Sequence, residues 1–168
     1  MNDYEDFFTL AEDILTHPKF IAQNAYHHHT SNLFEHALHV AYISYRVAVK
    51  FKLDTKTIIR GALLHDFFLY DWHIEGRRIK KRGFKKHGFT HAKIAYQNAS
   101  KYFNINPKEK DIILKHMFPL NIKPPRYKES WLVNLVDSYV TFKEYFKKHP
   151  RELYTFIEQR IEEKNKSN

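Results

Sequence analysis

The chain has 168 residues, and its 28 Lys and Arg outnumber its 19 Asp and Glu, which gives a formal net charge of +9. This length suits one ordinary domain, and the hydrophobic content of 43% excludes an intrinsically disordered chain despite the charge. No apolar run approaches the roughly 20 residues that span a bilayer, which excludes a membrane-spanning protein.

Cysteine is absent, which excludes disulfides, thiolate metal sites and cysteine nucleophiles. The acidic start, MNDYEDFFTL, lacks the basic and apolar regions of a secretory signal. The absence of cysteine fits a cytoplasmic protein, which is the location we expect. The 12 histidines are the unusual feature of the composition, and they are a first indication of metal or proton chemistry.

Helical periodicity runs through most of the chain, and no strand-like alternation is sustained. The first helix is expected over residues 3–15, ending at a His-Pro pair. The second is expected over residues 31–50. Its cap candidates are Ser31 and Asn32, and Glu35 is placed to complete a capping box.

The third helix is expected over residues 55–68, after the cap candidate Asp54. Residues 70–89 are basic and aromatic and hold three of the four glycines, which predicts a long loop with room for a short helix. Thr90 is the cap candidate of the next helix, which should end near residue 102.

Three further helices are expected over residues 107–117, 130–147 and 150–164, and the proline-rich segment MFPLNIKPPRYKES should connect the first two. The sequence therefore predicts an all-α fold, a single compact bundle of about seven helices. No linker or repeat divides it, so one domain is expected over residues 1–168.

Imidazole and carboxylate groups share helix faces with core residues on five of these helices. Asp137, for example, lies within the apolar run WLVNLVDSYV. One inward histidine is usually a hydrogen-bonded core residue, but a buried, unpaired carboxylate is costly and needs a cation or strong donors. Five such helices together indicate a metal site inside the bundle, held by imidazole and carboxylate. The candidate ligands are His36, His65, Asp66, His91, His116 and Asp137.

The order of these residues resembles the HD-domain superfamily of metal-dependent phosphohydrolases. The most specific part is GALLHDF, residues 61–67, where an apolar helix ends in a His-Asp doublet. The doublet follows NLFEHALHVA and precedes LVNLVDSYV, as in that superfamily. The resemblance covers about residues 32–146, and helices that flank such a core are common in the superfamily.

The resemblance implies a binuclear site that takes two divalent ions, with Fe, Mn, Zn, Ni and Co all chemically suitable. It places the first ion on His36, His65, Asp66 and Asp137. His91 and His116 match the two histidines that hold a second ion, and Asp66 would bridge both ions. His87 competes with His91 for the second ion and could instead contact phosphate.

The implied activity is hydrolysis of a phosphate ester of a nucleotide or related small molecule by a metal-bound hydroxide. Asp66 and Asp71 are the predicted catalytic residues, and His73 is a second candidate for general acid or base. A loop aspartate and a solvated histidine are the alternative readings of Asp71 and His73. The chain has Met-Phe-Pro where hydrolases of cyclic dinucleotides carry Gly-Tyr-Pro, which argues against that substrate.

A run of seven basic residues without an acid extends from Arg77 through Arg78 to Lys86. Such a run forms a positive rim that attracts a phosphate ester, binds nucleic acid, or is only a solvated loop. We expect Arg77, Arg78 and Lys86 to contact substrate, together with His73 and His87.

Three other functions also fit the sequence. Some HD-fold proteins use a di-iron pair to activate oxygen, and a histidine-rich, cysteine-free site suits iron. A degenerate HD domain could bind nucleotide as a regulator, although all six ligand candidates are present. Nucleic-acid binding through the basic run would weaken steeply with salt.

Overall fold

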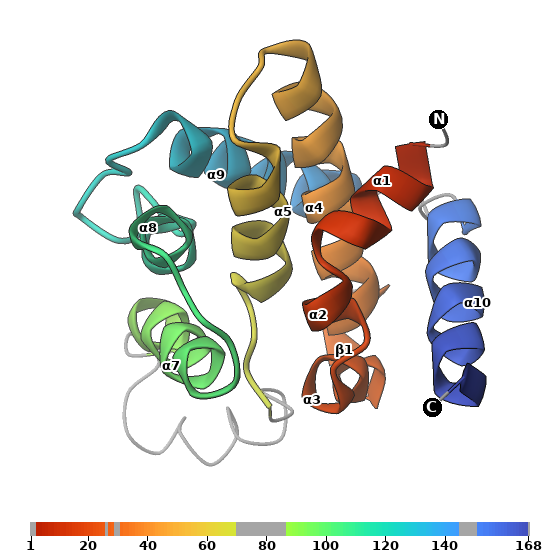
Figure 1. Ribbon diagram of the computed structural model, residues 1–168. Helices are drawn as coiled ribbons and strands as arrows, with labels where there is room; N and C mark the ends of the chain where they lie inside the picture. The colour runs from red at the N-terminus through yellow and green to blue at the C-terminus, as the bar shows by residue number, and fades with distance from the viewer. Residues whose placement is uncertain (1–2, 26, 29–30, 70–86, 145–150, 168) are drawn as a thin grey trace.

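The computed structural model describes residues 3–25, 27–28, 31–69, 87–144 and 151–167, and these confirm the all-α expectation (Figure 1). The N-terminal elements are α1 (Asp3–Leu10), α2 (Glu12–Leu15), α3 (Pro18–Ile21) and the 3₁₀ turn η1 (Ala22–Ala25). Two-residue strands, β1 (His27–His28) and β2 (Ser31–Asn32), then pair antiparallel. The remaining helices are α4 (Leu33–Lys50), α5 (Thr55–Leu64), α7 (His87–Tyr102), α8 (Pro107–Lys115), α9 (Lys128–Glu144) and α10 (Glu152–Ser167).

Helices α4 and α5 lie side by side at the centre of the fold (Figure 1). Both begin at predicted caps: the Asn32 side chain accepts the Glu35 N–H at 2.7 Å, and Asp54 accepts the Thr57 N–H at 3.1 Å. Helix α9 passes behind them, α7 and α8 pack on one side, and α1–α3 with α10 cover the other (Figure 1). Helices α4 and α5 thus form the centre of the bundle, and the other helices pack around them.

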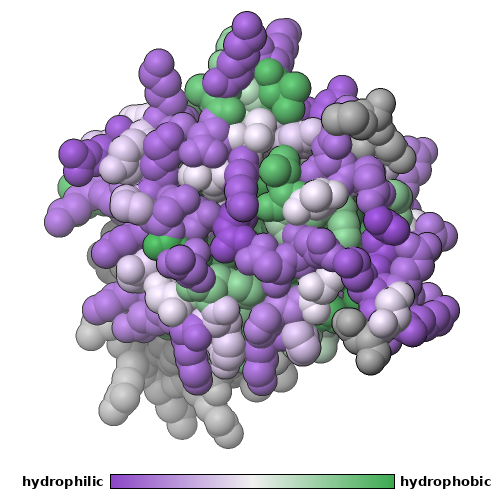
Figure 2. Space-filling view, in the orientation of Figure 1, coloured by the Kyte–Doolittle hydropathy of each residue, from purple (hydrophilic) through white to green (hydrophobic). Residues whose placement is uncertain are grey.

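One apolar core joins these elements. It contains Phe7 from α1, Ile58 from α5, Ile113 from α8, Val133 from α9 and Ile157 from α10, each fully buried. The face in Figure 2 is mostly hydrophilic, with apolar atoms gathered at the top over the turn between α4 and α5. Among the described residues, no helix has both the length and the hydropathy of a membrane-spanning segment.

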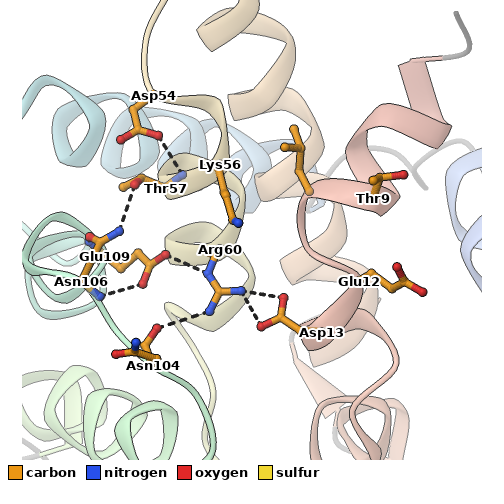
Figure 3. A pocket seen from close by; sticks show the side chains of 11 residues that line it. Thr9, Glu12, Asp13, Asp54, Lys56, Thr57, Arg60, Asn104, Asn106 and Glu109 are labelled. Carbon is orange, nitrogen blue, oxygen red and sulfur yellow. Dashed lines mark hydrogen bonds and ion pairs between the residues drawn. The ribbon is translucent and has the colours of Figure 1, made fainter.

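A groove of about 790 Å³ opens between the N-terminal helices, α5 and α8 (Figure 3). The buried Arg60 crosses it, placing Nη1 2.6 Å from both Asp13 oxygens and Nε 2.9 Å from Glu109 Oε1. Glu109 also accepts the Asn106 N–H and so completes a capping box at the start of α8. This groove is a junction that fastens α5 to α2 and α8, and none of its lining residues is a candidate ligand.

Several predicted helix boundaries were wrong. The first helix breaks at Ala11 (φ −138°, ψ 24°), which is fully buried, so that both short halves turn apolar residues into the core. A helix begins at Pro18 because proline suits a first turn and the His17 ring caps it by accepting the Lys19 N–H. Helix α7 begins at His87 rather than after Thr90, and α10 continues to Ser167.

Candidate metal centre

The structure brings six histidine and aspartate side chains from five helices or helix ends to one place. His36 lies in the first turn of α4, and Asp137 lies in the middle of α9. His65 with Asp66 directly follows α5, and His116 directly follows α8. None of the six residues, which include His91 of α7, is more than 8% exposed.

His36, His65 and Asp137 form the first group of potential ligands. Oδ1 of Asp137 lies 3.2 Å from Nε2 of His36 and 3.6 Å from Nε2 of His65. The ligand atoms of the group lie within 4.8 Å of one another, which is compact enough for one ion.

Asp66, His91 and His116 form the second group. The two Nε2 atoms of the histidines are 3.0 Å apart, and Oδ1 of Asp66 lies 3.4 Å from His116 and 3.7 Å from His91. The other oxygen of Asp66, Oδ2, lies 3.4 Å from Nε2 of His65 in the first group. Asp66 therefore presents a different oxygen to each group.

Hydrogen bonds at two helix ends orient the rings of His65 and His116, so that Nε2 of each ring faces the site. Nδ1 of His65 donates to the Ala62 carbonyl at 2.6 Å, and Nδ1 of His116 donates to the Ile113 carbonyl at 2.8 Å. Both histidines are the residue after a helix, where carbonyls of the last turn have no intrahelical partner. Because a carbonyl only accepts, Nδ1 carries hydrogen and Nε2 is left for a ligand bond in each case.

The charges at the site also suit a cation. Burial alone raises the pKa of the Asp66 carboxyl, but the charge on His65 and the hydrogen bond from His116 hold that pKa well below its usual range. Burial opposes the same change at Asp137, whose pKa is likewise lowered, first by the charge on His65. Two ionised carboxylates therefore lie among four imidazoles.

The pKa of His116 is raised, because the hydrogen bond and charge of Asp66 outweigh the lowering effect of burial. Nε2 of His65 is buried and has no hydrogen-bond partner among the described residues. In such a site, protons on imidazole and metal ions compete for the same nitrogens. The donor set of imidazole and carboxylate without thiolate fits Zn, Fe, Mn, Co or Ni.

Side-chain amides that the sequence analysis missed hold the backbone at these ligands. Nε2 of the fully buried Gln23 donates to the Asp66 carbonyl at 3.2 Å, and Nδ2 of Asn98 donates to the Phe67 carbonyl at 3.0 Å. Asn134 donates to the carbonyls of both His116 and Phe118. Helical spacing places Asn98 on the face of His91 and Asn134 on the face of Asp137, so the sequence could have identified these two amides. No pattern in the sequence identifies Gln23 as a contact of the site.

The other predicted site residues belong to the segment that ends at the start of α7. Asp71, His73, Arg77, Arg78 and Lys86 lie outside the described residues. His87 begins α7, but its side chain also lies outside the description. His91 belongs to the second group of ligand atoms.

The family model described as HD domain matches residues 33–142, which is more than half of the chain. Comparisons with the curated proteins and with the solved structures gave no match. All six buried histidine and aspartate residues fall inside the matched segment, in the order already given. The chain belongs to the HD domain family.

Proposed function

We propose that the protein is a metal-dependent phosphohydrolase that cleaves a phosphate ester of a nucleotide or a related small molecule. The observation that carries this proposal is the carboxylate of Asp66, which directs one oxygen to each of two buried histidine groups. HD domains are typically phosphohydrolases, and a carboxylate between two ion sites is what a binuclear centre needs.

The residues present fit two divalent ions. His36, His65 and Asp137 would hold one, His91 and His116 would hold the other, and Asp66 would contact both. When bound, two such ions supply an activated water and neutralise charge on phosphoryl oxygens.

Neighbouring residues of the chain keep these ligands ionised, oriented and shielded from bulk water. The lowered pKa values of Asp66 and Asp137 keep both carboxylates ionised at neutral pH. The carbonyls of Ala62 and Ile113 orient the rings of His65 and His116. Burial of all six side chains keeps bulk water from competing with the ligand atoms.

Substrate contacts are proposed from the sequence. Asp71 would act as general acid or base. The phosphate would be bound by basic residues of the segment between α5 and α7. These substrate-binding candidates are His73, Arg77, Arg78, Lys86 and His87. A cytoplasmic location, proposed from the cysteine-free composition, suits a nucleotide substrate.

The test is metal content and hydrolysis in the same preparations, purified without a His-tag or nickel column. Wild-type protein should hold about two ions per chain and hydrolyse members of a panel of nucleotides and p-nitrophenyl phosphate. Asp66→Ala should lose both the ions and at least about 100-fold in kcat/KM, because both ion sites lose a ligand. Glu162→Ala, which removes an exposed carboxylate of α10, is the matched control.

Circular dichroism of Asp66→Ala must show native helix content for the comparison to hold. Full hydrolysis by folded Asp66→Ala would refute the proposal. A cysteine-free, four-histidine centre also suits a di-iron oxygenase. Oxygen consumption and a mixed-valent iron signal, without phosphate release, would favour that enzyme instead.

A further inference from the structure

The outward face of α9 carries an apolar stripe. Its large side chains are exposed by 40% at Trp131, 63% at Leu135, 48% at Tyr139 and 64% at Phe142. Spacings of four, four and three residues place them on one side of the helix. The opposite side carries Asp137 and packs against α4 and α8. A helix that is apolar on both sides is typical of one that is covered on both sides.

The stripe also lacks charge. Lys128 and Lys143 mark its ends, and the exposed positions between them are apolar or, at Ser138, a hydroxyl. The two acids of this stretch point elsewhere, because Glu129 is buried beside Lys108 and Asp137 lies in the metal centre. An uncharged surface about 17 Å long, from Trp131 to Phe142, therefore runs along the helix.

We propose that this stripe, Trp131 to Phe142, binds the same stripe of a second copy of the chain. The two α9 helices would run antiparallel about a twofold axis at Leu135, which then packs on the partner's Leu135. In this register Trp131 faces the partner's Tyr139, and Lys128 faces the partner's Phe142. A symmetric contact of this kind needs only one surface that is complementary to itself.

The charges at the ends favour the antiparallel register. In a parallel pair, each lysine would lie against its own copy in the partner, and like charges would repel. In the antiparallel pair, Lys128 lies over the partner's Phe142 ring, a favourable contact for an ammonium group. Lys143 already adopts such a contact in its own chain, with Nζ 5.0 Å from the Tyr139 ring centre.

The stripe supplies about half the area of a standard interface, which suits a weak dimer. With aromatic side chains of about 150–250 Å² each, the exposed fractions give roughly 400 Å² of apolar surface per copy. A standard interface buries about 800 Å² per partner, and interface cores are enriched in aromatic residues. Leu120, which is 60% exposed, adds apolar surface close to Trp131, whose ring packs edge-on against Phe118 at 5.3 Å.

Analytical ultracentrifugation of the full chain over a concentration series tests the proposal. Wild-type protein should form dimers, and raising the salt should strengthen them because it screens repulsion between two chains of charge +9. Leu135→Lys should raise the dimer Kd by about 100-fold, since it places two like charges on the axis. Val49→Lys is the control, because Val49 is also exposed, by 52%, but lies on α4.

The absence of cysteine allows a second measurement. A residue on a twofold axis lies next to its own copy, so Leu135→Cys should oxidise rapidly to a disulfide-linked dimer, whereas Val49→Cys should not. Wild-type protein that stays monomeric at all concentrations would overturn the proposal. So would binding of monomers to anionic vesicles that Leu135→Lys abolishes and salt weakens, which would assign the stripe to a lipid surface instead.

Discussion

At the scale of single residues, the centre depends on side chains that would not themselves bind metal. Asn134 is 4% exposed and donates both of its amide hydrogens, to the carbonyls of His116 and Phe118. It thereby fixes the backbone at His116, which is one of the three residues of the second group. The side chain positions His116 through the main chain rather than by touching its ring.

We predict that Asn134→Ala lowers the free energy of unfolding by about 1–3 kcal/mol, because two buried carbonyls lose their donor. It should also weaken binding of the second metal ion while leaving the first in place. Urea unfolding and a metal titration measure the two effects. Gln97→Ala, which removes an exposed amide on α7, should change stability by less than about 0.5 kcal/mol. Equal behaviour of the two variants would contradict this role.

At the scale of elements, the approach of α5 to α8 brings the His-Asp doublet to His116. Gly61 makes that approach possible, since a Cβ there would lie 2.6 Å from Cδ1 of Ile112 and 3.0 Å from its Cβ. The Cδ1 methyl can move aside, but the Cβ of Ile112 moves only with its helix. The glycine therefore sets the distance between two elements that carry ligands.

Gly61→Ala should lower the free energy of unfolding by about 1–3 kcal/mol, because overpacking outweighs the gain in helix propensity of about 1 kcal/mol. Adding Ile112→Val removes the nearest methyl and should recover part of the loss. Thermal unfolding of the two single variants and the double variant forms a cycle that isolates the contact. A Gly61→Ala protein more stable than wild type would show that the helices have room to spare.

At the scale of the whole molecule, pH should act in opposite directions on metal-free and metal-loaded protein. The pKa of His116 in the fold is raised above the ordinary 6.5, so its protonated form stabilises the metal-free fold at low pH. That contribution is lost as the pH rises through the raised pKa. Metal binding instead requires an unprotonated ring and therefore strengthens as the pH rises.

We predict that between pH 6 and pH 9 the Tm of metal-free protein falls, while the Tm of protein with saturating zinc rises. Thermal scans of both forms at each pH provide the measurement, with His116→Gln as the control that flattens the metal-free curve. A metal-free Tm that rises over this range would contradict the assigned protonation. Below about pH 4 both forms should lose stability as Asp66 and Asp137 become protonated, because their pKa values are lowered in the fold.

The sequence by itself determined the helical class, the order of the six candidate ligands and the family resemblance. Inward-facing polar residues within apolar helix faces are visible in a sequence because helical spacing is regular. His36 and Asp137 could be found in this way, as could the caps Asn32 and Asp54. Helix caps and helix faces depend on residues that are close together in the sequence, so the sequence alone shows them.

Only the tertiary structure decided which atoms meet. The two oxygens of Asp66 face separate groups, and Gln23 reaches the Asp66 carbonyl, because distant segments pack together. The exposed apolar stripe of α9 could not be predicted from the sequence either. Both sides of that helix are apolar, so its pattern has no contrast to distinguish a buried face from an exposed one. Packing against α4 and α8 covers one side and leaves Leu135 on the other.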